Sequence, residues 1–125
     1  MGTANSLPIW LTIIRMETDV DHVLDALADP TRRQVVQMLG RGPRRAGELA
    51  GAAGMSAPAM SRHLRILLEA GLVADERGRE DARLRIFRLR PESLAGLQAW
   101  LDQLQAEWNE QLSAFKRHVE GRAGT

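Results

Sequence analysis

The chain has 125 residues, which is enough for one domain of ordinary size. Its 17 basic and 16 acidic residues leave a formal net charge of +1, and over the whole chain that balance argues against a nucleic-acid partner, because such proteins usually carry a basic excess. The absence of cysteine excludes disulfides, thiolate zinc sites and cysteine nucleophiles.

Residues 1–18 are expected to be an extension that precedes the domain. Residues 7–14 are apolar, but no basic segment comes before them and they are far shorter than the ~20 residues of a membrane span. We therefore predict a cytoplasmic protein that has no membrane partner. Because Met16 follows closely, residues 1–15 are an upstream extension of a chain that begins there, or they add contacts between subunits through Trp10, Ile13 and Ile14.

Two helices are predicted at the start of the domain. The first begins near residue 19, where apolar residues follow the i, i+3, i+4, i+7 spacing of one helical face: Val20, Val23, Leu24 and Leu27. The sequence Asp29-Pro30 supplies an N-cap and a proline at the first position of the second helix. That helix directs Val35, Val36 and Leu39 inward and ends at Gly40, Gly42 and Pro43.

The next two helices have the spacing of a helix-turn-helix. A short helix is expected over residues 46–53, with Gly54 as its C-cap. Ser56 caps a longer helix that runs to Ala70, where Gly71 ends it. Only residues 54–56 separate the two helices, which is the length of turn that this motif requires.

A β-hairpin and a long helix complete the chain. Residues 72–74 and 84–90 are expected to be strands around a polar loop that contains Gly78, with Phe87 and Leu89 inward and Arg88 and Arg90 outward. The last helix begins at Pro91 and ends near Val119, and residues 121–125 form a frayed tail. The predicted class is mainly α with a small β-hairpin: a winged helix-turn-helix over residues 19–120 with a long C-terminal dimerisation helix.

The helix over residues 56–70 has one apolar and one polar face. At about 100° per residue, one side carries the apolar residues Ala57, Met60, Leu64, Leu67 and Leu68. The other side is small and polar at first and then basic: Pro58, Ser61, Arg62, Arg65 and Glu69. Small leading residues let a helix enter the major groove, which is about 12 Å wide, and arginine can bind guanine O6 and N7.

His63 lies at the margin between these faces, where it is either a packed boundary residue or, as we favour, a contact to phosphate. The following hairpin, residues 75–90, is rich in arginine: Arg77, Arg79, Arg83, Arg85, Arg88 and Arg90. Because Glu76, Glu80 and Asp81 are interleaved with them, the hairpin is either a solvated charged surface or a DNA-contacting wing. Its place directly after a helix-turn-helix favours the wing.

The residues 26–33, 55–64 and 69–73 together resemble the ArsR family of bacterial winged helix-turn-helix repressors. The resemblance covers about residues 19–120. It implies a homodimer that binds a partly palindromic operator in double-stranded DNA, with wing arginines on the DNA backbone. It also implies that six residues lie on the recognition helix: Ser56, Pro58, Ala59, Ser61, Arg62 and His63.

The metal sites of the family are not matched. Arg45 and Gly47 stand where metal-sensing members carry cysteines, and Asp102 is not followed by the histidine of the second site. The chain therefore resembles the cysteine-free branch, some of whose members sense a small molecule or a partner protein. No metal and no cofactor are expected, and a small-molecule effector would be of unknown identity.

The last helix carries a near-heptad apolar seam, which predicts pairing with a second subunit. The expected dimer contacts on that seam are Leu97, Leu101, Leu104, Trp108, Leu112 and Phe115. The tryptophans are expected to pack in this interface, and the alternative is a ligand pocket lined by Trp10, Trp100 or Trp108.

The function that these patterns favour is a DNA-binding repressor, and the alternative is a winged helix that binds proteins rather than an operator. An enzyme is not expected, because His22, His63 and His118 fall on three different helices without catalytic partners. The charge also separates along the chain: residues 41–90 hold eleven arginines against six acidic residues, a net charge of +5, and the remainder carries −4. A basic helix-turn-helix and wing are thus masked in the near-neutral total.

Overall fold

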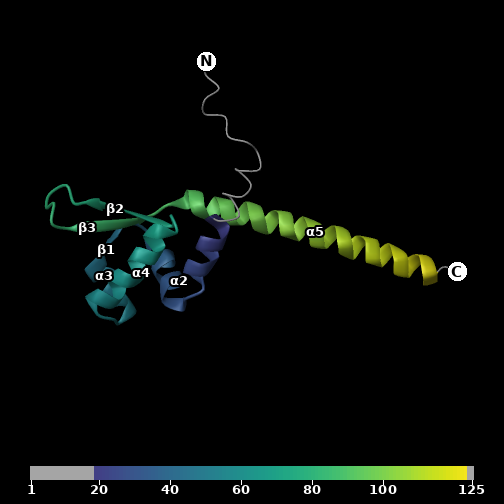
Figure 1. Ribbon diagram of the computed structural model, residues 1–125, viewed down its shortest axis with the longest axis horizontal. Coiled ribbons are helices and arrows are strands. Elements are labelled where there is room, and N and C mark those ends of the chain that lie inside the picture. The colour runs from purple at the N-terminus through teal and green to yellow at the C-terminus, as the bar shows by residue number, and fades with distance from the viewer. Residues whose placement is uncertain (1–18, 124–125) are drawn as a thin grey trace, which may run out of the picture.

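The computed structural model describes residues 19–123. A helix over residues 19–27 is followed in order by the elements labelled in Figure 1: α2 (Pro30–Leu39), β1 (Arg44–Arg45), α3 (Ala46–Ala53), α4 (Ala57–Glu69), β2 (Val73–Arg77), β3 (Arg85–Leu89) and α5 (Pro91–Ala123). The helices and the small sheet form one body, and α5 extends far out of it. This order confirms the predicted class, mainly α with a small hairpin and a long C-terminal helix.

Local signals at the helix ends account for the position of α4. Gly54 ends α3 in the left-handed conformation, with φ of 66°, which side-chain-bearing residues rarely adopt. Two residues later the Ser56 hydroxyl accepts a hydrogen bond from the Ala59 N–H at 3.3 Å and so caps α4. The predicted bounds of both helices are confirmed to within one residue.

The hydrophobic core lies between α4, its neighbouring helices and the sheet. Met60, Leu64 and Leu67 of α4 are buried against Leu49 of α3 and Phe87 of β3. The apolar face predicted for α4 is therefore confirmed except at one residue. Ala57 is exposed, because it is the first residue of α4 and precedes Met60, the first buried residue of the helix.

The sheet contains one strand that the sequence did not predict. Its order is β1-β3-β2, with both pairs antiparallel, and the two residues of β1 pair with Phe87 and Ile86 of β3. The strand β2 also continues to Arg77, through residues that were expected to be loop. Both differences arise because pairing with β3 satisfies the backbone there, and no apolar alternation marks such segments.

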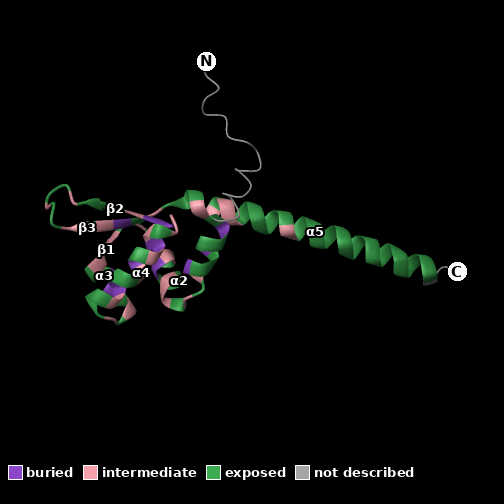
Figure 2. Cartoon of the chain, viewed as in Figure 1, coloured by how far each residue is buried: buried purple, intermediate pink, exposed green. Residues whose placement is uncertain are grey.

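Only the first turns of α5 pack against the body. Leu94 and Leu97 contact the core, and most of the helix beyond them is exposed (Figure 2). The large apolar residues of this helix that are exposed are Trp100, Leu101, Trp108, Leu112, Phe115 and Val119. The helix continues to Ala123, so the expected end at Val119 is wrong. Residues 121–123, which were expected to belong to a frayed tail, are part of the helix.

The base of α5 is hydrogen-bonded to the segment that directly follows α4. The Ser93 hydroxyl donates to the Gly71 carbonyl at 2.5 Å, and the Arg90 N–H donates to the Leu72 carbonyl at 2.8 Å. Gly71 itself has a φ of 75°, which again suits glycine. The end of α4 and the start of α5 are thus held together. Within residues 19–123, no helix is long and apolar enough to cross a membrane.

Candidate nucleic-acid interface

The outward face of α4 is fully accessible. Ser56, Pro58, Ser61, Arg62 and Arg65 are all exposed, and Ala59 is half-buried. Small side chains surround the first turn, and the two arginines follow within the next two turns. Neither Arg62 nor Arg65 forms a hydrogen bond or ion pair with another residue of 19–123. Their guanidinium groups are therefore available to a phosphate or to a guanine edge.

His63 is half-buried at the edge of this face, and its ring contacts α2. Its Nδ1 lies 3.3 Å from Nη1 of Arg32, which in turn donates from Nε to the Ala26 carbonyl at 2.6 Å. The Arg32 backbone N–H also bonds the Asp29 carboxylate, and this bond is the main reason that the pKa of Asp29 lies below its ordinary value. The sequence indicated His63 as a candidate but gave no sign of its partner.

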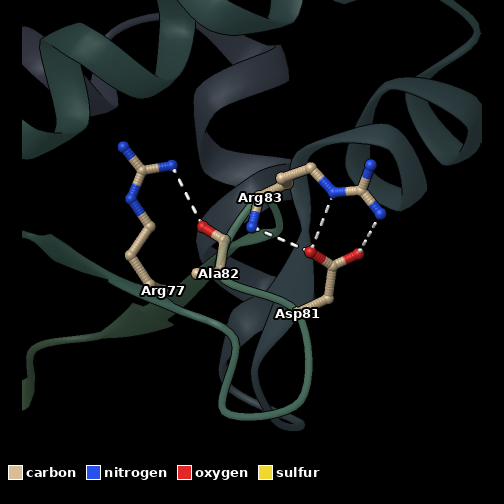
Figure 3. Close-up of polar contacts among 4 residues, drawn as sticks. All are labelled: Arg77, Asp81, Ala82 and Arg83. Carbon is tan, nitrogen blue, oxygen red and sulfur yellow. Dashed lines mark hydrogen bonds and ion pairs between the residues drawn. The ribbon is translucent and has the colours of Figure 1, made fainter.

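Three of the six arginines of the wing, residues 75–90, are held by other residues of the wing. Arg83 forms a fork on Asp81, with Nε and Nη2 donating to the two carboxylate oxygens at 3.1 and 3.2 Å (Figure 3). Arg77 reaches back to the Ala82 carbonyl at 3.4 Å, as Figure 3 also shows. Arg79 lies at the tip, exposed and without a bond to another described residue. These contacts tie the loop together and occupy two guanidinium groups.

Arg85, on strand β3, is also paired with an acidic residue of the wing. Its Nη2 lies 2.6 Å from Oδ2 of Asp75 on the neighbouring strand, and its guanidinium carbon stands 5.1 Å above the ring of Phe87. The acidic partners Asp75 and Asp81 are the functional residues that the sequence analysis missed as such. The interleaving of acidic residues and arginines was the signal, but the pairing depends on the strand register.

The bond to Arg83 also changes the acidity of Asp81. The side-chain and backbone hydrogen bonds from Arg83 hold the pKa of Asp81 below its ordinary value of 3.8. The pairing therefore favours the ionised form of this carboxylate. Over residues 75–85, four arginines are balanced by four acidic residues.

A hollow joins α4 to the wing on the same side of the molecule. It has a volume of about 350 Å³, and its polar and charged lining comes from Ser61 and Arg65 of α4 and Arg85 of β3, with Phe87 below. The structure therefore brings Ser61 and Arg65 of the helix and Arg85 of the wing together at one hollow.

The dimer residues predicted on α5 fall into two groups. Leu97 packs on the core, so it serves the fold of the subunit itself. Leu101, Trp108, Leu112 and Phe115 are exposed and Leu104 is half-buried, so they stay available to another chain. The predicted contacts of Trp10, Ile13 and Ile14 lie outside the described residues. Among the described residues there is no cluster of three or more histidine or carboxylate groups that could hold a metal ion.

The helix-turn-helix, the hairpin and the exposed basic face define the class: this is a winged helix-turn-helix DNA-binding protein. Comparison with known proteins gives its family. The family model described as "Bacterial regulatory protein, arsR family" matches residues 29–75. The HTH-type transcriptional regulator Rv2034 of Mycobacterium tuberculosis is 38% identical over 100 residues, which cover 80% of this chain and 88% of that protein.

Two further relatives are informative about assembly and action. The transcriptional repressor SdpR of Bacillus subtilis is 38% identical over 58 residues, which cover 46% of this chain and 64% of the repressor. The homodimeric winged helix-turn-helix DNA-binding domain Mb0332 of Mycobacterium bovis is 26% identical with a TM-score of 0.57, over 86% of this chain and 94% of that one. This chain belongs to the ArsR family and is a DNA-binding transcriptional regulator. The family consists of regulators, not of enzymes.

Proposed function

We propose that the protein acts as a homodimeric repressor that binds a palindromic operator, with α4 in the major groove and the wing on the DNA backbone. The observation that carries this proposal is the exposed face of α4, where small residues come first and the unpaired Arg62 and Arg65 follow. The repressor and homodimer named among its relatives support the same assignment. Such a protein acts in the cytoplasm, where bacterial DNA lies.

The DNA contact can be tested without knowledge of the operator. Duplexes selected by the protein from random fragments should converge on one site with two half-sites about one helical turn, roughly 34 Å, apart. A protein-interaction module would select no sequence. Specific binding should also weaken steeply with salt, with a log–log slope of about −0.9 for each phosphate contact.

The dimer has its own test on α5. Leu112 and Phe115 are 65% and 66% exposed in the single subunit, so charged residues there should leave its fold intact. We expect Leu112→Glu with Phe115→Glu to sediment as a folded monomer and to bind a two-site operator at least tenfold more weakly. The matched control is Ala106→Glu with Ser113→Glu, which adds the same charge to exposed positions on the other side of α5. A variant that remains dimeric would show that this seam is not the interface.

The tryptophans of α5 are assigned to the same interface. Trp100 and Trp108 are 39% and 53% exposed, and Trp108 borders a shallow hollow with Gln111, Leu112 and Phe115. Their fluorescence should shift to shorter wavelength when dimers form on concentration. A small-molecule effector at this place would perturb the same signal. A ligand that relieves repression without changing the fluorescence would place the effector site elsewhere.

A further inference from the structure

Arg32 of α2 connects the end of the first helix, the start of α2 and the helix α4. Its Nε donates to the Ala26 carbonyl at 2.6 Å and its Nη2 to the Asp25 carbonyl at 3.4 Å, both at the end of the helix over residues 19–27. Its own backbone N–H is fixed by the Asp29 carboxylate at 3.1 Å. The remaining arm of the guanidinium, Nη1, lies 3.3 Å from Nδ1 of His63 on α4. The side chain is thus held at both ends, and it is half-buried.

The chemistry of this contact fixes the state of the His63 ring. A guanidinium is protonated throughout the accessible pH range and can only donate hydrogen bonds. Nδ1 of His63 must therefore be the acceptor, so its single ring proton lies on Nε2. A doubly protonated ring would place an N–H against an N–H and would lose the bond to Arg32.

His63 stands at the edge of the exposed basic face, between Arg62 and Leu64 along α4. Its Nε2 has no hydrogen-bond partner among residues 19–123. We propose that Arg32 is a positioning residue for DNA binding: it holds the neutral ring of His63 so that Nε2–H donates to a DNA phosphate. This inference rests on the proposed function. It assigns to the helix face a donor that carries no charge, beside the two arginines that do.

Arg33 provides a matched control. It is the next residue, carries the same charge, and also donates to carbonyls at the end of the first helix, those of Leu27 at 2.8 Å and Ala28 at 3.2 Å. It does not contact His63. Arg32→Met and Arg33→Met therefore remove the same charge and a similar pair of carbonyl contacts, and only the first removes the bond to the ring.

The first experiment uses the protein without DNA. Ring ¹⁵N NMR should show His63 as the Nε2–H tautomer, with Nδ1 shifted as a hydrogen-bond acceptor. In Arg32→Met the ring should change to a mixture of tautomers, and in Arg33→Met it should stay as in the wild type. Identical ring spectra in all three proteins would overturn the assignment of Arg32.

The second experiment measures affinity and salt dependence on the selected duplex. Arg32→Met and His63→Phe should each bind about tenfold more weakly, and their combination no more weakly than either alone, because they disrupt one contact. Since a neutral donor displaces no counterion, the slope of log affinity against log salt should be unchanged. His63→Phe leaves the contacts of the first helix intact, so its result does not depend on folding of the Arg32 variant.

Two results would overturn the proposal. One is an equal loss in Arg32→Met and Arg33→Met, which would be an effect of charge alone. The other is a slope of log affinity against log salt that is shallower by about 0.9 in Arg32→Met than in the wild type, which would mean that Arg32 itself contacts a phosphate. If the wild type binds no duplex at all, the proposed function fails, whereas the tautomer measured without DNA still decides whether Arg32 positions the ring.

Discussion

The helix α4 carries two arginines and the wing, residues 75–90, carries six, and the two elements hold them in different states. On α4, Arg62 and Arg65 are exposed and form no hydrogen bond or ion pair with other described residues. On the wing, Arg83 is forked on Asp81 and Arg85 is bound to Asp75. The helix is seated on a buried face that includes Met60 and Leu67, whereas the tip of the hairpin is exposed.

This difference bears on what each element can contribute to binding. An unpaired arginine on a rigid helix loses little when it meets a phosphate or a base. Arg83 or Arg85 of the wing must first leave its carboxylate, and that exchange offsets part of the gain. A count of basic residues alone would rank the wing above the helix, but Arg77, Arg83 and Arg85 of the wing are already engaged within it.

The largest effect should separate the two elements directly. Arg62→Ala with Arg65→Ala should weaken operator binding by about a hundredfold or more, since each contact is worth about 1–3 kcal/mol. Arg83→Ala with Arg85→Ala should cost less than about tenfold, because both arginines exchange one anionic partner for another. Lys116→Ala with Arg117→Ala removes the same charge from the far part of α5 and serves as the control. Equal losses in the helix and wing variants, measured by titration at one salt concentration, would contradict the comparison.

A smaller effect of opposite sign should follow from the acidic partners. Asp75→Asn weakens the pair with Arg85, and Asp81→Asn weakens the fork of Arg83, so each should tighten DNA binding several-fold. The controls are Glu76→Gln and Glu80→Gln, which change the wing charge equally but release no ion pair. If the controls gain as much affinity as the aspartate variants, the overall charge of the wing is what matters.

The smallest effect concerns acidity. Because Arg83 lowers the pKa of Asp81 below 3.8, the ion pair stabilises the folded protein above that value, and its contribution is lost as the pH falls through the lower, folded pKa. Carboxyl ¹³C NMR should give an Asp81 midpoint below 3.8. In Arg83→Ala the midpoint should return toward 3.8. An unchanged midpoint would mean that the fork is absent in solution.

The helices and strands could be predicted from the sequence far better than the contacts between them. Asp29, Gly54 and Ser56 act within one or two turns, so their caps could be predicted from neighbouring residues alone. The two residues of β1 become a strand only through β3, which lies some forty residues later. The contact between Arg32 and His63 spans 31 positions. Such pairs depend on how α2 packs beside α4, and periodicity carries no information about that.

The same limit applies to the candidate site. The outward residues of α4 followed from a helical wheel, because one face of that helix had to be buried. The ion pairs of the wing could not be predicted in this way, since Asp75 reaches Arg85 only in the strand register that pairs Asp75 with Phe87. A shift by one residue would have placed the two side chains on opposite faces of the sheet.

The attachment of α5 has a mechanical consequence. Its 33 residues extend for about 50 Å, yet only the first two turns are fixed, by Ser93, Leu94 and Leu97. The free part acts as a lever whose short end is hydrogen-bonded to Gly71, two residues after the end of α4. A tilt of about 5° at that joint moves the far end by roughly 4 Å. Conversely, the angle at which two long helices cross would set the separation of the two DNA-reading helices, so small changes far from the DNA can alter their spacing.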